Sequence, residues 1–148
     1  MVSFRSAAVW ETMQDFTRRT LWDMRVVRAE LLTPPPGKGS KFRITYRVFG
    51  ITFWVENEYI VWKPRERSGI RATRFSRPTF FTNAAGSWHF RDNGDGSSTW
   101  TTIVSLSMVG GPLAPLFEKV AVGWYFLWLT TRSGQNLKRL VESYARAA

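Results

Sequence analysis

The stretch Lys41–Val48 (KFRITYRV) alternates between polar and apolar side chains, and similar alternation continues as far as Met108. Successive side chains of a β-strand point to opposite faces of a sheet, so this pattern predicts strands with one buried face. From about Leu113 onward, apolar residues recur instead at the spacing of a helix. A long apolar helix that follows a run of strands needs an apolar surface to bury against. The order of the elements therefore predicts an α+β fold, in which a curved antiparallel sheet wraps around a long C-terminal helix.

The individual strands are predicted from this alternation and from the turn residues between them. In chain order, we expect strands at Val2–Arg5 on one edge, Val26–Leu32, Lys41–Val48, Thr52–Trp62, Ile70–Phe75, Thr79–Arg91 and a final strand that ends at Met108. A two-residue hairpin loop at Gly50-Ile51 and a turn at Asn93–Gly96 join neighbouring strands. The sheet should therefore contain about six to seven strands.

The same alternation predicts which side chains face the helix. These are Phe42, Ile44, Tyr46 and Val48; Phe53, Val55, Asn57, Tyr59 and Val61, with Trp62 on the opposite face; Phe80, Thr82, Ala84, Gly86, Trp88 and Phe90; and Trp100, Thr102, Val104, Leu106 and Met108. Small residues on an inward face, such as Ala84 and Gly86, indicate either a close approach of the helix or an unfilled space.

Helical spacing predicts the remaining elements. Val9, Met13 and Phe16 recur at this spacing after Ser6, and Thr17–Trp22 forms a second short helical turn, so two short helices should follow the first strand. In the closing helix, the apolar positions are Phe117, Val120, Trp124, Leu127/Trp128, Leu137, Leu140/Val141 and Tyr144. No internal repeat or linker is visible, and residues 1–148 are predicted to form one domain.

Composition limits the chemistry that is open to the chain. It has 148 residues, of which 44% are hydrophobic, no cysteine and one histidine, His89. Disorder, disulfides, thiol chemistry and a multi-histidine metal site are therefore excluded, and no cofactor is expected. No secretory signal is visible, and the apolar run Val120–Leu129 is too short to span a membrane, so we expect a cytoplasmic protein.

The net charge is +10, from 21 Lys and Arg residues against 11 acidic residues. A field of this sign attracts nucleic acid, anionic membranes and acidic partners. The basic residues are spread along the chain rather than gathered in one run, which favours a solvated basic surface. Weak contact with an anionic membrane or with nucleic acid stays open, and no oligomeric state is predicted.

Several short stretches, taken in order, resemble a known family. They are Ala8–Glu11 ahead of Asp15, Trp22-Asp23, Gly37–Ser40 before Phe42, Glu58–Val61 before Pro64, Trp88–Phe90 before Asp95–Thr99, and Leu137–Leu140. The chain is similar to the START-like, helix-grip (SRPBCC) proteins of the polyketide cyclase/dehydrase and lipid-transport group. It departs from them in its short first strand and in Ser6-Ala7-Ala8, where the family usually has a proline.

This resemblance implies a deep cavity between the sheet and the long helix that holds a hydrophobic small molecule, with a mouth at Gly110–Pro115. Asn57 is the most informative polar candidate, because it interrupts an apolar face at mid-strand and a buried amide needs a hydrogen-bond partner. A ligand is one such partner; Tyr46, Thr102 or water are the others. The predicted ligand-binding residues are Tyr46, Phe53, Asn57, Tyr59, Trp88, Trp100, Thr102, Trp124 and Trp128.

No catalytic residue can be assigned from the sequence. Glu56 and Glu58 share one face of a strand as an acid/base pair would, but Arg43 or Arg47 on the neighbouring strand is expected to neutralise them. His89 falls opposite Trp88 and Phe90 and is expected to face solvent.

The leading hypothesis is a non-enzymatic binder or carrier of a lipid, an acyl chain or a polyketide-like ring. The first alternative is a polyketide cyclase, aromatase or dehydratase, in which Tyr46, Asn57, Tyr59 and Arg74 would polarise a carbonyl group. The second alternative is a basic module that binds RNA, a ribosome or a membrane surface.

Overall fold

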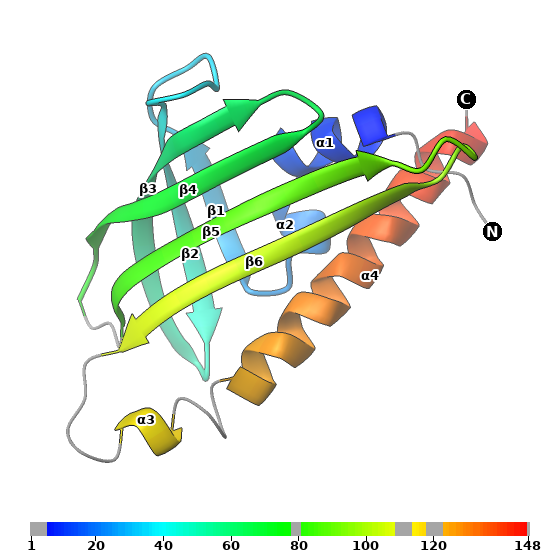
Figure 1. Cartoon of the computed structure of the whole chain (residues 1–148). Coiled ribbons are helices and arrows are strands. Elements are labelled where there is room, and N and C mark those ends of the chain that lie inside the picture. The colour runs from blue at the N-terminus through cyan, green and yellow to red at the C-terminus, as the bar shows by residue number, and fades with distance from the viewer. Residues whose placement is uncertain (1–5, 78–80, 109–113, 118–122, 148) are drawn as a thin grey trace.

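The computed structural model describes residues 6–77, 81–108, 114–117 and 123–147. In chain order, the elements are α1 (Ser6–Gln14), α2 (Arg19–Trp22), β1 (Val26–Leu31), β2 (Lys41–Val48), β3 (Ile51–Lys63), β4 (Arg67–Phe75), β5 (Phe81–Asp92), β6 (Ser98–Met108), α3 (Ala114–Phe117) and α4 (Gly123–Ala147). They confirm the predicted α+β class, with an antiparallel sheet, short N-terminal helices and a long C-terminal helix (Figure 1). The predicted edge strand Val2–Arg5 and residues 110–113 of the predicted mouth lie outside the described residues.

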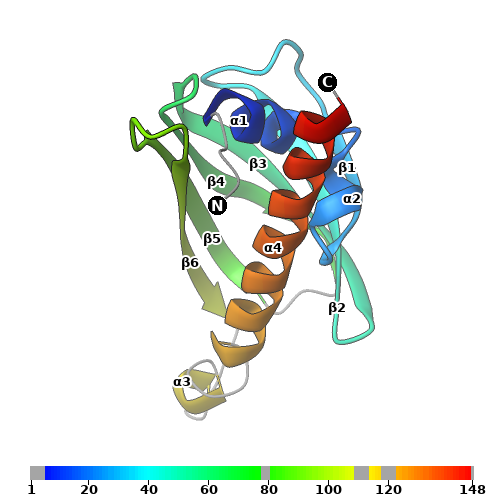
Figure 2. The same cartoon turned by 90° about the vertical axis from the view of Figure 1, so that its right-hand side faces the viewer.

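The six described strands pair in the order in which they follow one another along the chain, from β1 to β6, and every pair is antiparallel. The sheet curves, and α4 runs across its open side (Figure 2). α1 and α2 pack against α4, and α1 lies at the opposite end of the molecule from α3 (Figure 2). The sheet therefore has one face turned toward α4 and one face turned away from it.

The loop between β2 and β3 consists of Phe49-Gly50, one residue earlier than predicted, because Val48 pairs with Ile51. Phe49 and Gly50 have φ angles of 52° and 74°. Two positive φ angles in succession match the twist of a two-residue hairpin. Phenylalanine rarely adopts a positive φ, so its part in the turn could not be recognised from the sequence. Its ring stacks on Tyr125 of α4 at 4.3 Å between centroids.

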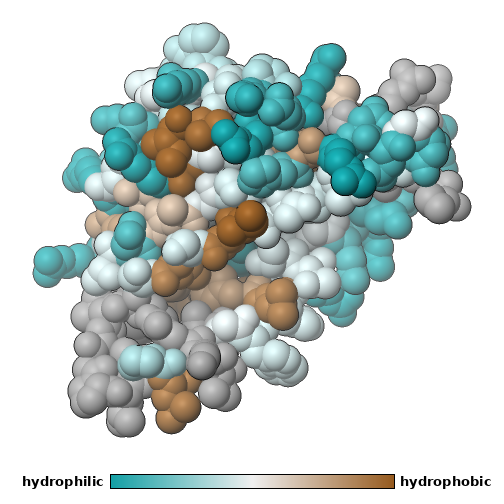
Figure 3. Space-filling view, viewed as in Figure 1, coloured by the Kyte–Doolittle hydropathy of each residue, from teal (hydrophilic) through white to brown (hydrophobic). Residues whose placement is uncertain are grey.

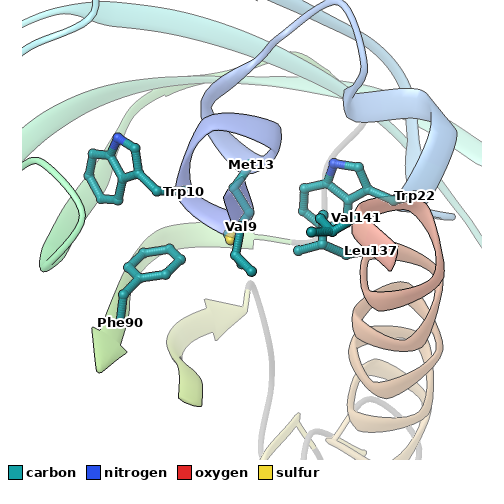
Figure 4. Packing of buried hydrophobic residues seen from close by; sticks show 7 residues of the cluster. All are labelled: Val9, Trp10, Met13, Trp22, Phe90, Leu137 and Val141. Carbon is teal, nitrogen blue, oxygen red and sulfur yellow. The ribbon is translucent and has the colours of Figure 1, made fainter. Parts of the chain in front are cut away.

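One end of the sheet is filled by a solid apolar cluster, which Figure 4 shows. Its buried members are Val9, Trp10 and Met13 of α1, Trp22 of α2, Phe90 of β5, and Leu137 and Val141 of α4. The aromatic rings meet edge to face, as Trp10 does with Phe90 at 5.2 Å between centroids. This cluster joins α1, α2 and the C-terminal half of α4 to the sheet.

The predicted inward face of β3 is confirmed for Phe53, Val55, Asn57 and Tyr59, which are all buried. Beyond Tyr59 the prediction is wrong. The register with β4 shifts between Tyr59 and Val61, and such an irregularity rotates the following side chains to the other face. Trp62 therefore packs in the core, with its ring 4.7 Å from that of Tyr59.

A second register shift changes the start of β5. It lies between Phe81 and Asn83, so Phe81 is buried whereas Thr82, predicted to face inward, is exposed. Ala84 and Trp88 lie on the inner face, as the alternation predicts. Phe80 is outside the described residues.

The long helix has the predicted period, but its first half is turned differently from the prediction. Trp124 is 75% exposed, and Leu127, Trp128 and Tyr144 are also exposed. The buried positions are Leu137 and Val141, as predicted, and Leu129 and Ser133, which were not predicted; the four follow one another at four-residue spacing. A polar residue such as Ser133 gives no apolar signal, so the buried stripe could not be placed from hydrophobicity alone. The sequence predicts one long helix from near Leu113. Among the described residues, the short helix α3 begins at Ala114 and the long helix α4 begins at Gly123.

Apolar residues are also exposed on the sheet. In the view of Figure 1, several apolar groups lie across the middle of the molecular surface, with hydrophilic residues above them (Figure 3). On β6, Ile103 and Val104 are among the exposed large apolar residues. Within the described ranges, no helix is long and apolar enough to cross a membrane.

The packed cluster should contribute much of the stability. Leu137 is only 1% exposed at its centre, so Leu137→Ala should lower the free energy of unfolding by about 2–5 kcal/mol, through lost burial and a residual cavity. Leu21→Ala is the control, because Leu21 is 61% exposed and should change stability by less than about 0.5 kcal/mol. Urea denaturation measures both variants. If Leu137→Ala and Leu21→Ala lowered the free energy of unfolding equally, the cluster around Leu137 would not be the stabilising core.

Candidate ligand cavity

A cavity of about 430 Å³ lies between the inner face of the sheet and the N-terminal half of α4. This volume falls in the range of about 300–1,000 Å³ that is usual for small-molecule sites. Residues of α2, of the five strands β2 to β6 and of α4 line it, together with Arg25, which precedes β1. They are Arg19, Arg25, Tyr46, Val48, Phe53, Val55, Asn57, Ile70, Phe75, Phe81, Ala84, Ala85, Gly86, Trp88, Thr102, Val104, Leu106, Gly123, Phe126, Leu127 and Thr130.

Small residues on β5 leave the space open. A Cβ atom added to Gly86 would lie 3.5 Å from the Ile103 carbonyl oxygen and 3.7 Å from Ile70 Cγ1, and no other described atom would lie within 4 Å. Gly86 is therefore not forced by a close approach of α4. Of the two explanations that the sequence left open for Ala84 and Gly86, the geometry agrees with an unfilled space.

The cavity has an apolar part and a polar part. On β5, the lining runs from Phe81 to Trp88, seven residues along the strand and about 23 Å at 3.3 Å per residue. Beside Phe81 the wall is apolar, because the ring of Phe126 lies 5.8 Å from that of Phe81 and Leu106 lines the cavity opposite Ala84. Beside Trp88 the wall includes Thr102, which pairs with Trp88 on β6.

Three charged residues meet at the polar end, near the junction of α2 and β1. Arg25 makes a bidentate ion pair with Asp23, with Nε 2.8 Å from Oδ1 and Nη2 2.9 Å from Oδ2. Arg19 approaches the same carboxylate, with Nη2 3.3 Å from Oδ2. The guanidinium of Arg19 also lies over the rings of Trp22 and Trp88, at 4.4 and 5.7 Å from their centroids.

This ionic cluster is tied to α4. Ser133 Oγ donates to Asp23 Oδ1 at 3.4 Å and accepts from the backbone N–H of Met24 at 3.2 Å. Arg25 Nη1 donates to Thr130 Oγ1 at 3.3 Å. Ser133 and Thr130, the polar residues on the inward face of α4, therefore have hydrogen-bond partners. These partners explain why polar residues can lie on this face.

Burial and charge act in opposite directions on Asp23, whose side chain is fully buried. Burial acts to raise its pKa, but the charges of Arg25 and Arg19 and the hydrogen bonds from Arg25 outweigh burial and hold the pKa below the ordinary value of 3.8. Asp23 is thus a carboxylate at neutral pH. Burial likewise acts to lower the pKa of Arg25, and the charge of Asp23 raises it in spite of burial.

Two further polar residues of the cavity wall, Tyr46 and Asn57, are neutral. Tyr46 lines the cavity, and burial raises the pKa of its hydroxyl although Arg25 acts to lower it, so the group is protonated. Asn57 also lines the cavity, and its Nδ2 donates to the Val55 carbonyl oxygen at 3.2 Å. The partner of this amide group is thus the backbone, which was not among the partners expected from the sequence.

Five of the nine predicted ligand-binding residues line the cavity: Tyr46, Phe53, Asn57, Trp88 and Thr102. Four do not: Tyr59, Trp100, Trp124 and Trp128. The Tyr59 hydroxyl donates to Gln14 Oε1 at 2.6 Å within the core, and Trp100 meets Trp22 edge to face. Trp124 is exposed, and Trp128 stacks against Tyr125 on the outside of α4.

The sequence did not point to Arg19, Arg25, Phe81, Phe126 and Thr130 as lining residues. The sequence contains 21 Lys and Arg residues. Nothing distinguishes Arg19 and Arg25 from the others except that they lie close to Asp23 in the chain. Phe81 faces the cavity because of the register shift at the start of β5, and Phe126 faces it because of the way α4 is turned about its axis. None of these follows from hydrophobic periodicity.

The candidate acid/base residues lie on the outer face of the sheet. Arg43 donates to Glu56 Oε1 at 2.6 Å, as predicted, and Arg74 lies 3.6 Å from Oε2 of the same residue. Glu58 pairs with Arg71 at 3.2 Å. His89 is half-buried on this face and shares a hydrogen bond with Ser87. Within the described part of the chain, no group of three or more acidic or histidine side chains is placed to hold a metal ion.

The family is established by comparison with known sequences. The family model "Polyketide cyclase / dehydrase and lipid transport" matches residues 2–142, and the chain therefore belongs to this family. The predicted resemblance is thus confirmed. A search of curated proteins finds no match.

Solved structures with the same fold are distant in sequence. A protein from Thermus thermophilus has a TM-score of 0.70 at 16% identity, over 99% of this chain and 92% of that one. A START superfamily protein from Mycobacterium smegmatis has a TM-score of 0.67 at 13% identity, over 99% and 92% of the two chains. Ginseng major latex-like protein 151 from Panax ginseng has a TM-score of 0.61 at 13% identity, over 96% and 89%. At such identities, these structures establish the helix-grip fold alone.

Asp23→Asn should lower the free energy of unfolding at neutral pH by about 3–5 kcal/mol, because it leaves two buried guanidinium groups without a carboxylate. In the wild type, the pKa of Asp23 is lowered on folding, so its ionic contribution is present above pH 3.8 and is lost as the pH falls through the folded-state pKa. The variant should therefore lose less stability than the wild type between pH 5 and pH 2.

Urea denaturation across this pH range measures the difference. Glu66→Gln is the control, because Glu66 forms an exposed ion pair with Lys63 and should change stability little. An Asp23→Asn variant that matched the wild type at neutral pH would contradict the account of the cluster.

Proposed function

We propose that the protein binds a hydrophobic small molecule, such as a lipid, an acyl chain or a polyketide-like ring, in the cavity between the sheet and α4. The observation that supports this proposal is the cavity itself, about 430 Å³ in volume, with a mainly apolar wall and a few polar groups at one end. Binding sites for small molecules commonly have this composition. Each buried CH₂ group of a ligand would contribute about 0.8 kcal/mol.

The arrangement of polar groups favours a binder over a cyclase or dehydratase. Of the four residues that would carry such chemistry, Tyr46 and Asn57 line the cavity, whereas Tyr59 is engaged with Gln14 and Arg74 is on the outer face with Glu56. General acid/base catalysis needs a titratable group within reach of the substrate. Among the described lining residues, none is a carboxylate or a histidine.

Native mass spectrometry of the freshly purified protein tests the proposal. We expect a mass increase that corresponds to one bound hydrophobic molecule per chain, which organic extraction would release for identification. After extraction and refolding, the protein should enhance the fluorescence of Nile red, a neutral apolar dye, at one site per chain. A protein that carries no adduct and does not bind Nile red would contradict the proposal.

A substitution that fills part of the cavity should weaken binding while the protein still folds. Ala84→Trp places an indole in the space beside Leu106, and Nile red affinity should fall by about tenfold or more, a loss of at least about 1.4 kcal/mol. Asn83→Trp is the matched control, since the adjacent residue on the same strand is exposed. Thermal unfolding should confirm that both variants are folded. If the Ala84→Trp and Asn83→Trp variants bound Nile red with equal affinity, the dye would bind outside the cavity.

A further inference from the structure

The polar end of the cavity has an excess of positive charge. Arg19 and Arg25 both line the cavity, and both make their ion pairs with one carboxylate, that of Asp23. Two guanidinium groups against one carboxylate leave one positive charge. Among the described lining residues, no other side chain is charged.

This charge is poorly solvated. The side chains of Arg19 and Arg25 are 11% and 15% exposed, and that of Asp23 is fully buried. An unbalanced charge in such surroundings interacts strongly with any counter-charge that enters, because little water is present to screen it. The cavity is therefore electrostatically complementary to an anion.

Hydrogen-bond donors remain for such an anion. A guanidinium group has five N–H donors. Of those of Arg25, three are directed to Asp23 and Thr130 in the described structure. Besides its contacts with the rings of Trp22 and Trp88, Arg19 makes only two long polar contacts, 3.3 Å to Asp23 and 3.4 Å to the Met13 carbonyl oxygen, so three of its five N–H groups, including that of the buried Nε, have no hydrogen-bond partner among the described residues. The hydroxyl group of Tyr46 is a further donor on the same part of the wall.

The rest of the wall is suited to an apolar group. Phe53, Phe75, Phe81, Leu106 and Phe126 line it together with smaller apolar side chains. A ligand that satisfies both parts of the cavity has an anionic group at one end and an apolar chain or ring at the other. A single negative charge matches the single excess positive charge, whereas a doubly charged phosphate monoester would leave a net charge buried.

We propose that the ligand is an amphipathic monocarboxylate, such as a fatty acid or an apolar ring acid, whose carboxylate group faces Arg19 and Arg25. This inference rests on the proposed binding function and specifies the class of ligand for the same cavity. Charge-assisted hydrogen bonds to guanidinium are among the stronger polar interactions in proteins, so the carboxylate should contribute clearly to affinity.

Three ligands with the same apolar chain test the inference on the wild-type protein: decanoate, decanol and decyltrimethylammonium. Isothermal titration calorimetry at neutral pH measures their affinities. We expect decanoate to bind about tenfold or more tightly than decanol, and decyltrimethylammonium to bind least. Equal affinities for decanoate and decanol would overturn this inference and leave the proposed apolar binding intact. Failure of all three to bind would count against the proposed function itself.

A variant then locates the interaction. Arg19→Gln removes the excess charge but keeps the bidentate pair between Arg25 and Asp23, so the fold should be retained. Its affinity for decanoate should fall about tenfold, and its affinity for decanol should not change. Arg18→Gln is the matched control, because the neighbouring Arg18 is exposed and pairs with Asp15. A decanoate affinity that is unchanged in Arg19→Gln would contradict the proposed orientation. Should Arg19→Gln not fold, the three ligands on the wild-type protein decide alone.

Discussion

The ion pairs of the buried Asp23 carboxylate connect the parts of the molecule that surround the cavity. Asp23 follows α2 and precedes β1, and its partners are Arg19 of α2, Arg25 before β1 and Ser133 of α4. Breaking one partner of a buried ion pair is costly, because the remaining charge has no water around it. These contacts, with those of Arg25 to Thr130 and of Met24 to Ser133, therefore tie the segment between α2 and β1 to the middle of α4 beside the cavity.

The two halves of α4 have different surroundings as a result. On the C-terminal side of Ser133, Leu137 and Val141 pack in the solid cluster with α1 (Figure 4). On the N-terminal side, Phe126 and Thr130 face the cavity, opposite the small residues of β5. In the first half, Tyr125 and Phe126 are only partly buried against the apolar side chains of the sheet, whereas Leu137 and Val141 of the second half are buried. In a protein that binds a hydrophobic molecule, the ligand would supply the missing apolar contacts.

The sequence predicted the class of fold correctly because long alternating strands and a helical period are strong signals. It predicted the two-residue loop one position too late, since Phe49 adopts a positive φ that its residue type does not favour. It placed Trp124 and Trp128 in the site because apolar residues usually face inward, whereas Ser133 and Thr130 occupy that face through polar contacts with Asp23 and Arg25. Ion pairs and register shifts depend on the whole fold and were not visible in local patterns.

A crystal structure of the protein with decanoate would show whether the cavity is an open apolar space with a cationic end. We expect electron density for one decanoate beneath α4, with the carboxylate within hydrogen-bond distance of Arg19 or Arg25 and the chain directed toward Phe81. Density for the carboxylate at the opposite end would contradict the orientation. A cavity closed by its own side chains, with decanoate absent or on the surface, would contradict the claim as a whole.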